Sequence, residues 1–333
     1  MTGRGSMEAF EGKLGPILSG GEENPVIRRL AINWERRATV KRDDPDLLEL
    51  FDVGLPDYPE GIVPFRDHPI YQGLAPDRRM EILTWAMIAL NRNTIFSEQH
   101  VVNPAFSLIL KGEFPGLWGH ALEISLMQSM VDEQYHSLMH RIASGVMRQR
   151  RNREYNDELL PLPHYSRVHQ DLNAKAEERW QRSLLTLAFA TITELCIGGY
   201  LELIAKAPGI QPMNVALAKL HRHDEVCHGS INGELVEVLF PQLTRDQQDY
   251  LLEALCRALE AYAANDYGTW RTILRIVDVP GSEEMLREVQ SGGRRTLFRD
   301  YSGLYRVFEH LEVLDRIEFD WSNVRLSGEI PYE

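Results

Sequence analysis

Cysteine is scarce in this chain of 333 residues, which contains only Cys196, Cys227 and Cys256. An odd number of cysteines without Cys-x-x-Cys spacing argues against a disulfide framework, a zinc ribbon and a dithiol redox motif. The first 25 residues are rich in glycine and lack the apolar stretch of a secretory signal. We therefore expect residues 1–25 to be mobile or foreign to the natural protein, and the remainder to carry reduced thiols in a cytoplasm.

Basic residues are fewer than acidic ones. The chain has 36 Lys and Arg against 49 Asp and Glu, which gives a formal net charge of −13. Nucleic acids and anionic membranes are bound through basic surfaces, so we expect neither as a partner. A Gly-rich nucleotide-binding motif after a strand is absent as well. If the protein carries out redox chemistry, its electrons should come from an external reductase or another electron donor.

Alternating apolar patterns of the kind that form β-strands are not found, whereas apolar residues recur every three to four positions in several long segments. This periodicity predicts an all-α fold. The expected helices cover residues 26–41, 77–102, 117–150, 177–207, 212–240 and 244–276, with a shorter one near 301–315. The proline-rich segment Asp52–Ala75 is expected to wrap the helices as an extended strap.

One segment, Ser183–Ala205, is apolar and long enough to suggest a membrane span. Glu194 lies at its midpoint, where an unpaired carboxylate would be costly in lipid. A helix that is apolar all round with one acid inside suits the centre of a helix bundle that buries a metal ion. We therefore expect no membrane association.

Carboxylates and histidines occur in an order typical of a two-metal site. Residues three or four apart share a helix face, so Glu133 and His136 point the same way, as do His221, Glu225 and His228. Each Glu-x-x-His pair follows a helix that carries a Glu at a similar distance, Glu98 before Glu133 and Glu194 before Glu225. This duplication predicts a ferritin-like four-helix bundle core with additional helices, in which residues 26–333 form one domain around two metal ions.

The type of ligand restricts the type of metal. A mixed set of carboxylates and imidazoles suits Fe(II) or Mn(II) better than zinc or calcium. A single Glu-x-x-His pair often occurs by chance on a solvated helix face, but two pairs with two preceding acids are much more specific.

Residues beside these ligands suggest supporting roles. Asp132 and Asp224 precede the two Glu-x-x-His pairs and could bind the outer ring nitrogens of the histidines on the facing hairpin, although acids near a helix end can also be surface residues. His140, one turn after His136, could support a ligand or belong to the core. Gly198 and Gly199 follow Glu194 by one turn and allow either close helix packing or space for a substrate ring.

With these residues placed, the chain resembles the p-aminobenzoate N-oxygenases from about Arg28 to the 310s. The resemblance is carried by LPDYPEGIVPF at residues 55–65, VDEQYHSLMH at 131–140, LHRHDEVCHGSI at 220–231 and RDYSG at 299–303. It implies a homodimeric di-iron monooxygenase of antibiotic biosynthesis that activates O2 as a peroxide. Its substrate would be an aromatic amine, oxidised through hydroxylamine and nitroso to a nitro group.

The resemblance also implies which residues bind each iron. Glu98 and His136 would bind one iron, Glu194, His221 and His228 the other, and Glu133 and Glu225 would bridge them. His221 is the most specific element, because related bacterial di-iron proteins use only two histidines.

The expected substrate pocket departs from the family in one respect. Aminobenzoate-type members carry an arginine at the position of Asn93, and a buried benzoate needs a cationic partner or several donors. A larger or uncharged arylamine is therefore expected, unless Arg299 or another arginine replaces the missing cation. The pocket candidates are Asn91, Asn93, Thr94, Gly198, Gly199, Tyr200 and Arg299. The alternative functions are a di-iron C–H hydroxylase or desaturase and a ferritin-like iron-binding protein.

Overall fold

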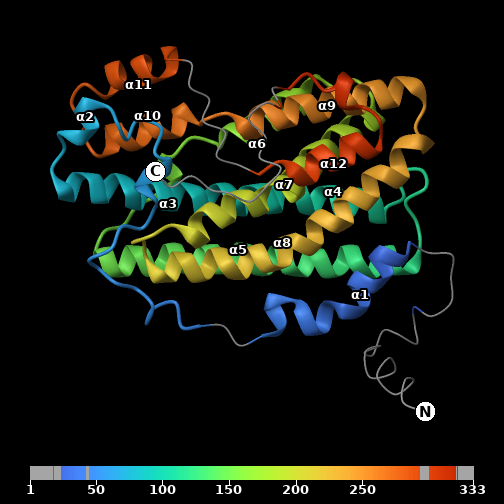
Figure 1. Cartoon of the computed structure of the whole chain (residues 1–333), viewed down its shortest axis with the longest axis horizontal. Coiled ribbons are helices and arrows are strands. Elements are labelled where there is room, and N and C mark those ends of the chain that lie inside the picture. Colours follow the sequence, from blue (N-terminus) through green and yellow to red (C-terminus); the bar gives the residue numbers. More distant parts are fainter. Residues whose placement is uncertain (1–17, 19–23, 43–44, 293–299, 320, 322–333) are drawn as a thin grey trace.

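The structure is a computed structural model that describes residues 18, 24–42, 45–292, 300–319 and 321 (Figure 1). Every regular element in these residues is a helix. The four longest are α3 (Pro76–Ser97), α5 (His120–Arg151), α7 (Arg179–Lys206) and α8 (Pro212–Leu239), and they pack against one another as a bundle. The predicted all-α fold with a ferritin-like four-helix core is confirmed.

Further helices cover this core. Helix α1 (Pro25–Arg37) packs on α5 and α8, and Figure 1 shows it alongside both. Helices α6 (His164–Lys175) and α9 (Arg245–Ala263) pack against α7 and each other, and α12 (Ser302–His310) packs on α7 and α8. Asn24 caps α1 through its side chain and Leu18 is buried, whereas the rest of the N-terminal segment 1–23 lies outside the described residues.

The sequence patterns missed some short helices and fused two others. Helices α4 (Asn103–Leu110), α6 and α11 (Ser282–Ser291) were not predicted, because eight to twelve residues give few repeats of an apolar period. The single helix expected over 244–276 is divided into α9 and α10 (Tyr267–Ile276). Ala264 leaves the helical conformation, and the Asp266 side chain accepts a hydrogen bond from the Thr269 N–H to cap α10.

Helix α7 holds the apolar segment that resembled a membrane span. A capping box between Glu178 and Gln181 begins the helix. The helix is long and apolar enough to cross a membrane, but 72% of its most apolar window is buried inside the fold. This is the burial expected of a central helix in a bundle.

Helix α3 changes its hydrogen-bonding pattern where it reaches the bundle centre. It continues as a π-helical segment, η4 (Glu98–Val102), in which the Asn103 N–H bonds the Glu98 carbonyl oxygen. Pro104 follows directly, and because proline lacks an N–H and clashes with the carbonyl four residues earlier, a regular α-helix cannot continue through it. Glu98 therefore stands at the start of a widened turn, and such turns are frequent at functional sites.

The proline-rich strap covers the bundle but is not extended. It contains turns, the 3₁₀ segment η3 (Glu60–Ile62) and the short helix α2 (Pro69–Gln72). Its anchor is the buried carboxylate of Asp57, which accepts hydrogen bonds from Thr84 of α3 and from Arg151 of α5 at 3.0 Å. Asn214 of α8 donates to the Asp57 carbonyl oxygen at 2.7 Å. The strap is thus bound to three of the four core helices.

Candidate metal centre

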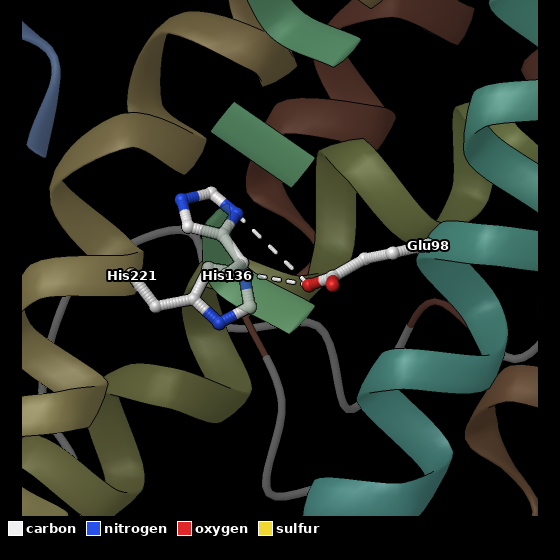
Figure 2. A group of neighbouring side chains, drawn as sticks. All are labelled: Glu98, His136 and His221. Atoms are coloured by element: carbon white, nitrogen blue, oxygen red, sulfur yellow. Dashed lines mark ion pairs between the residues drawn. The ribbon is translucent and has the colours of Figure 1, made fainter. Parts of the chain in front are cut away.

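All seven residues predicted as metal ligands meet inside the four-helix core, and all are buried. They form two groups, and within each group the ligand atoms lie within 4.8 Å of one another. Figure 2 shows the first group, in which the Glu98 carboxylate faces the rings of His136 and His221. The second group consists of Glu133, Glu194, Glu225 and His228.

Two of the histidines are oriented by aspartates from the opposite helix. His136 on α5 turns Nδ1 toward Glu133 and Nε2 toward Asp224 of α8, whose Oδ2 is 3.2 Å away. His228 on α8 turns Nδ1 toward Glu133, at 2.7 Å, and Nε2 toward Asp132 of α5, at 3.2 Å. Each aspartate next to a Glu-x-x-His pair therefore contacts the histidine of the facing hairpin, and in both rings Nδ1 is the inward nitrogen.

The aspartates are in turn held by the N-terminal part of the chain, which the sequence patterns did not connect with the site. The indole Nε1 of Trp34 donates to Asp132 at 2.9 Å, and the backbone N–H of Thr39 donates to Asp224 at 3.2 Å. Burial alone would raise the pKa of Asp224, but the hydrogen bonds from His136 and Thr39 and the charge of His136 lower it to about 2.

The third histidine lies at one end of the cluster. His221 Nε2 is 3.0 Å from Glu225 Oε1 and 3.4 Å from Glu98 Oε1, and its ring centroid is 4.1 Å from that of His136. The family resemblance implied that His221 shares a metal with Glu194 and His228, whereas the structure groups it with Glu98 and His136. His221 lies two helical turns before His228 on α8, so the two rings enter the cluster at different ends.

Burial and like charges strain the cluster electrostatically. Desolvation, followed by the charge of Glu133, raises the pKa of Glu98 and of Glu194 well above the ordinary value. Among the described residues, several buried inward-facing atoms make no well-formed hydrogen bond: Glu98 Oε1, both carboxylate oxygens of Glu133, Glu194 Oε2, Glu225 Oε2, and Nδ1 of His136 and His228. Two divalent cations would satisfy these atoms and balance four carboxylates, so the donor set fits two metal ions.

A cavity reaches this centre from outside the bundle. The volume that the centre of a water molecule can occupy inside this cavity is about 190 Å³. Glu98, Glu133, Glu194, Glu225 and His221 form part of its wall. Apolar and polar side chains of α3 and α7, Tyr58 of the strap, residues of the segment 160–165 and the α9–α10 corner, including Trp270, form much of the rest. The arrangement places space for an organic molecule directly beside the candidate metal ligands.

The structure places three of the predicted pocket residues, Asn93, Thr94 and Tyr200, in the wall of this cavity. The Tyr200 hydroxyl is 2.6 Å from that of Tyr58, which the sequence analysis had not selected. Arg92, which was not among the predicted pocket residues, also lines the cavity.

The other pocket candidates lie elsewhere. Asn91 points toward α5, where it bonds His140 and Ser144. Gly199 allows close packing, because a Cβ atom there would lie 2.8 Å from the backbone nitrogen of Asp300, and Gly198 does not line the cavity. The structure therefore does not place Asn91, Gly198 or Gly199 in the cavity wall, and Arg299 lies outside the described residues.

Comparison with known proteins agrees with the site. Residues 21–312 match the family model described as P-aminobenzoate N-oxygenase AurF. The 4-aminobenzoate N-oxygenase of Streptomyces thioluteus is 35% identical over 311 residues, which cover 92% of each chain. The match favours an N-oxygenase, and hence an oxidoreductase, over the iron-storage and C–H oxidase alternatives. The chain belongs to the p-aminobenzoate N-oxygenase family.

Proposed function

We propose that this protein is a di-iron arylamine N-oxygenase of natural-product biosynthesis, which oxidises an aromatic amine through hydroxylamine and nitroso stages to a nitro group. The observation that carries the proposal is the buried set of four carboxylates and three histidines, several of whose inward atoms make no well-formed hydrogen bond, at the wall of an organic-sized cavity. When bound, the two irons would supply dioxygen activation. Family membership supports iron over manganese.

The residues around the site would position these groups and exclude water. The seven ligand candidates would hold the metals, and Ser137 donates to Glu98 Oε2 at 2.7 Å, which fixes that carboxylate. Asp132 and Asp224 would keep the protons of His228 and His136 on Nε2, leaving the Nδ1 lone pairs for metal. Oxidation of an amine to a hydroxylamine consumes one O2, two electrons and two protons and releases one water, so an external reductase would supply the electrons.

The cavity wall supports an uncharged or larger arylamine rather than free 4-aminobenzoate. Among the described residues that line it, Arg92 is the only lysine or arginine. Its guanidinium already donates to the Pro161 carbonyl oxygen. A benzoate would thus meet a single cation, one of whose N–H groups is already bonded, together with several buried glutamates.

The test is anaerobic loading with two Fe(II) per chain, followed by reaction with ¹⁸O₂, an electron donor and either 4-aminobenzoate or its methyl ester. We expect ¹⁸O-labelled hydroxylamine, nitroso or nitro products, with faster turnover of the ester. Failure of every arylamine to yield a labelled nitrogen product would refute N-oxygenation. Faster turnover of 4-aminobenzoate, with a KM that rises in Arg92→Gln, would refute the uncharged substrate alone.

A homodimer in the cytoplasm is part of the same proposal. Helix α5 exposes four apolar side chains, Met127, Val131, Leu138 and Ile142, whose spacing places them along one face. Contiguous exposed apolar surface of this kind often marks a protein interface. The three cysteines are free thiols, as expected in a reducing compartment. Sedimentation analysis of Leu138→Glu tests the dimer, because a monomer is expected only if this face is the interface.

A further inference from the structure

His221 is connected to the outside of the cluster by a chain of hydrogen bonds that contains no charged group. His221 Nδ1 is 3.0 Å from Nε2 of His140 on α5, and His140 Nδ1 is 2.8 Å from the side-chain carbonyl oxygen of Asn91 on α3. The Asn91 amide nitrogen donates to the Ser144 hydroxyl oxygen at 3.0 Å. All four side chains are buried.

The direction of this chain fixes where the protons lie. The Asn91 carbonyl oxygen can only accept, so His140 must carry its proton on Nδ1. A neutral imidazole carries one proton, which leaves His140 Nε2 as the acceptor for a proton on His221 Nδ1. The lone pair of His221 then lies on Nε2, which is 3.0 Å from Glu225 Oε1 and 3.4 Å from Glu98 Oε1, so that a metal ion and not a proton would join this nitrogen to the carboxylates. A ring that binds a metal ion must offer an unprotonated nitrogen, so His221 is neutral when it acts as a ligand.

We propose that Asn91 and His140 are positioning residues that hold His221 in the tautomer with its proton on Nδ1 and its lone pair on Nε2, ready to bind a metal. The inference rests on the proposed function only in that His221 is taken as a ligand. It differs from the arrangement around His136 and His228, whose outer nitrogens face aspartates. A neutral hydrogen-bond partner raises the basicity of the ring less than a carboxylate does. Metal binding by His221 should therefore depend more on the orientation of its ring than on the charge of its partner.

The test compares the full-length chain with Asn91→Leu, which removes the acceptor without a large change in size. Asn103→Leu is the matched control, because the Asn103 amide is also buried but makes no hydrogen bond in the described part of the chain. The first measurement identifies the tautomers of ¹⁵N-labelled histidines by long-range ¹H–¹⁵N correlation, with the His221 signals assigned from the spectrum of His221→Gln. The second measures the affinity for each of two Zn(II) ions by competition with a chelator.

In the wild-type chain, His221 and His140 should both carry the proton on Nδ1. Asn91→Leu should shift His221 toward the Nε2-protonated form and weaken one of the two Zn(II) sites by about 10–100-fold, while Asn103→Leu changes neither. The proposal is overturned if wild-type His221 is protonated on Nε2, or if Asn91→Leu leaves tautomer and affinity unchanged. A purely structural role for Asn91 would lower the melting temperature without moving the tautomer, and would also overturn it.

A second variant guards against misfolding of Asn91→Leu. His140→Leu breaks the chain one link closer to the metal, so it should produce the same change of tautomer and the same loss at one site. The tautomers are read in the metal-free chain as well. If the protein shows the expected tautomers and metal affinities but forms no N-oxygenation product, the proposed function is refuted and this inference is not. If it forms the product but the tautomer of His221 does not depend on Asn91, this inference alone is refuted.

Discussion

The two halves of the metal centre follow one pattern and differ at one point. The α3–α5 half contributes Glu98, Glu133 and His136, and the α7–α8 half contributes Glu194, Glu225 and His228. In each half an aspartate precedes the Glu-x-x-His pair and contacts the histidine of the other half, so the halves orient each other.

The α7–α8 half adds His221, whose outer nitrogen meets a neutral histidine instead of an aspartate. The residues that the two halves share and the added His221 therefore have different roles. The symmetrical residues would balance the charge of two cations, whereas the added ring would bring a donor nitrogen without further charge. Its orientation depends on Asn91 and His140 from the opposite half. The predictions below test this division, from the largest expected effect to the smallest.

Removal of Glu225 should have the largest effect, because its Oε1 lies within 3.4 Å of a ring nitrogen of all three histidines. Glu225→Ala should reduce the iron content below one per chain and lower activity by roughly 10³-fold or more, as for residues that act as a unit. Metal analysis and product assays measure both. Glu237→Ala, a carboxylate on α8 outside the centre, is the control, and a Glu225 variant that keeps two irons would contradict a shared role.

Asp132 and Asp224, each of which contacts a histidine of the other half, should contribute equally to metal binding. Asp132→Asn and Asp224→Asn keep the side-chain size but remove the negative charge that faces His228 or His136. Each should weaken metal binding by about 10–100-fold, measured by competition with a chelator. A strong effect of one variant and none of the other would show that the halves are not equivalent.

Much of this arrangement could be predicted from the sequence, because helix periodicity determines which residues share a face. Five of the seven ligand candidates and the two aspartates follow from spacing within single helices, and Glu98 and Glu194 follow from the order in which the helices repeat along the chain. Periodicity does not determine which neighbour a face meets, so Asn91 was assigned to the substrate cavity although it faces α5. The contact between Trp34 and Asp132 joins positions 98 residues apart, and no local pattern indicates it.

Close packing of the α7–α8 half gives a third prediction. A Cβ atom on Gly229, next to His228, would lie 3.2 Å from the Glu194 carbonyl oxygen, whereas one on Gly198 would meet nothing within 4 Å. Gly229→Ala should separate the two helices at the ligands and destabilise the protein by about 1–3 kcal/mol. Gly198→Ala should stabilise it by roughly 0.5–1 kcal/mol through helix propensity. Thermal unfolding measures both, and equal changes would show that the approach at Gly229 is not tight.

The smallest effect concerns whether a neutral partner keeps a buried histidine uncharged, as argued for His221. His169, outside the centre, bonds the Thr186 hydroxyl at 3.2 Å, and burial lowers its pKa to about 4. Between this value and the unfolded value of about 6.5, the unfolded chain binds more protons, so stability falls as the pH falls. Wild type should lose about 1 kcal/mol relative to His169→Gln between pH 6.5 and 5.5 in urea unfolding. Parallel curves would mean that His169 is protonated while buried, and that a neutral partner does not keep a ring uncharged.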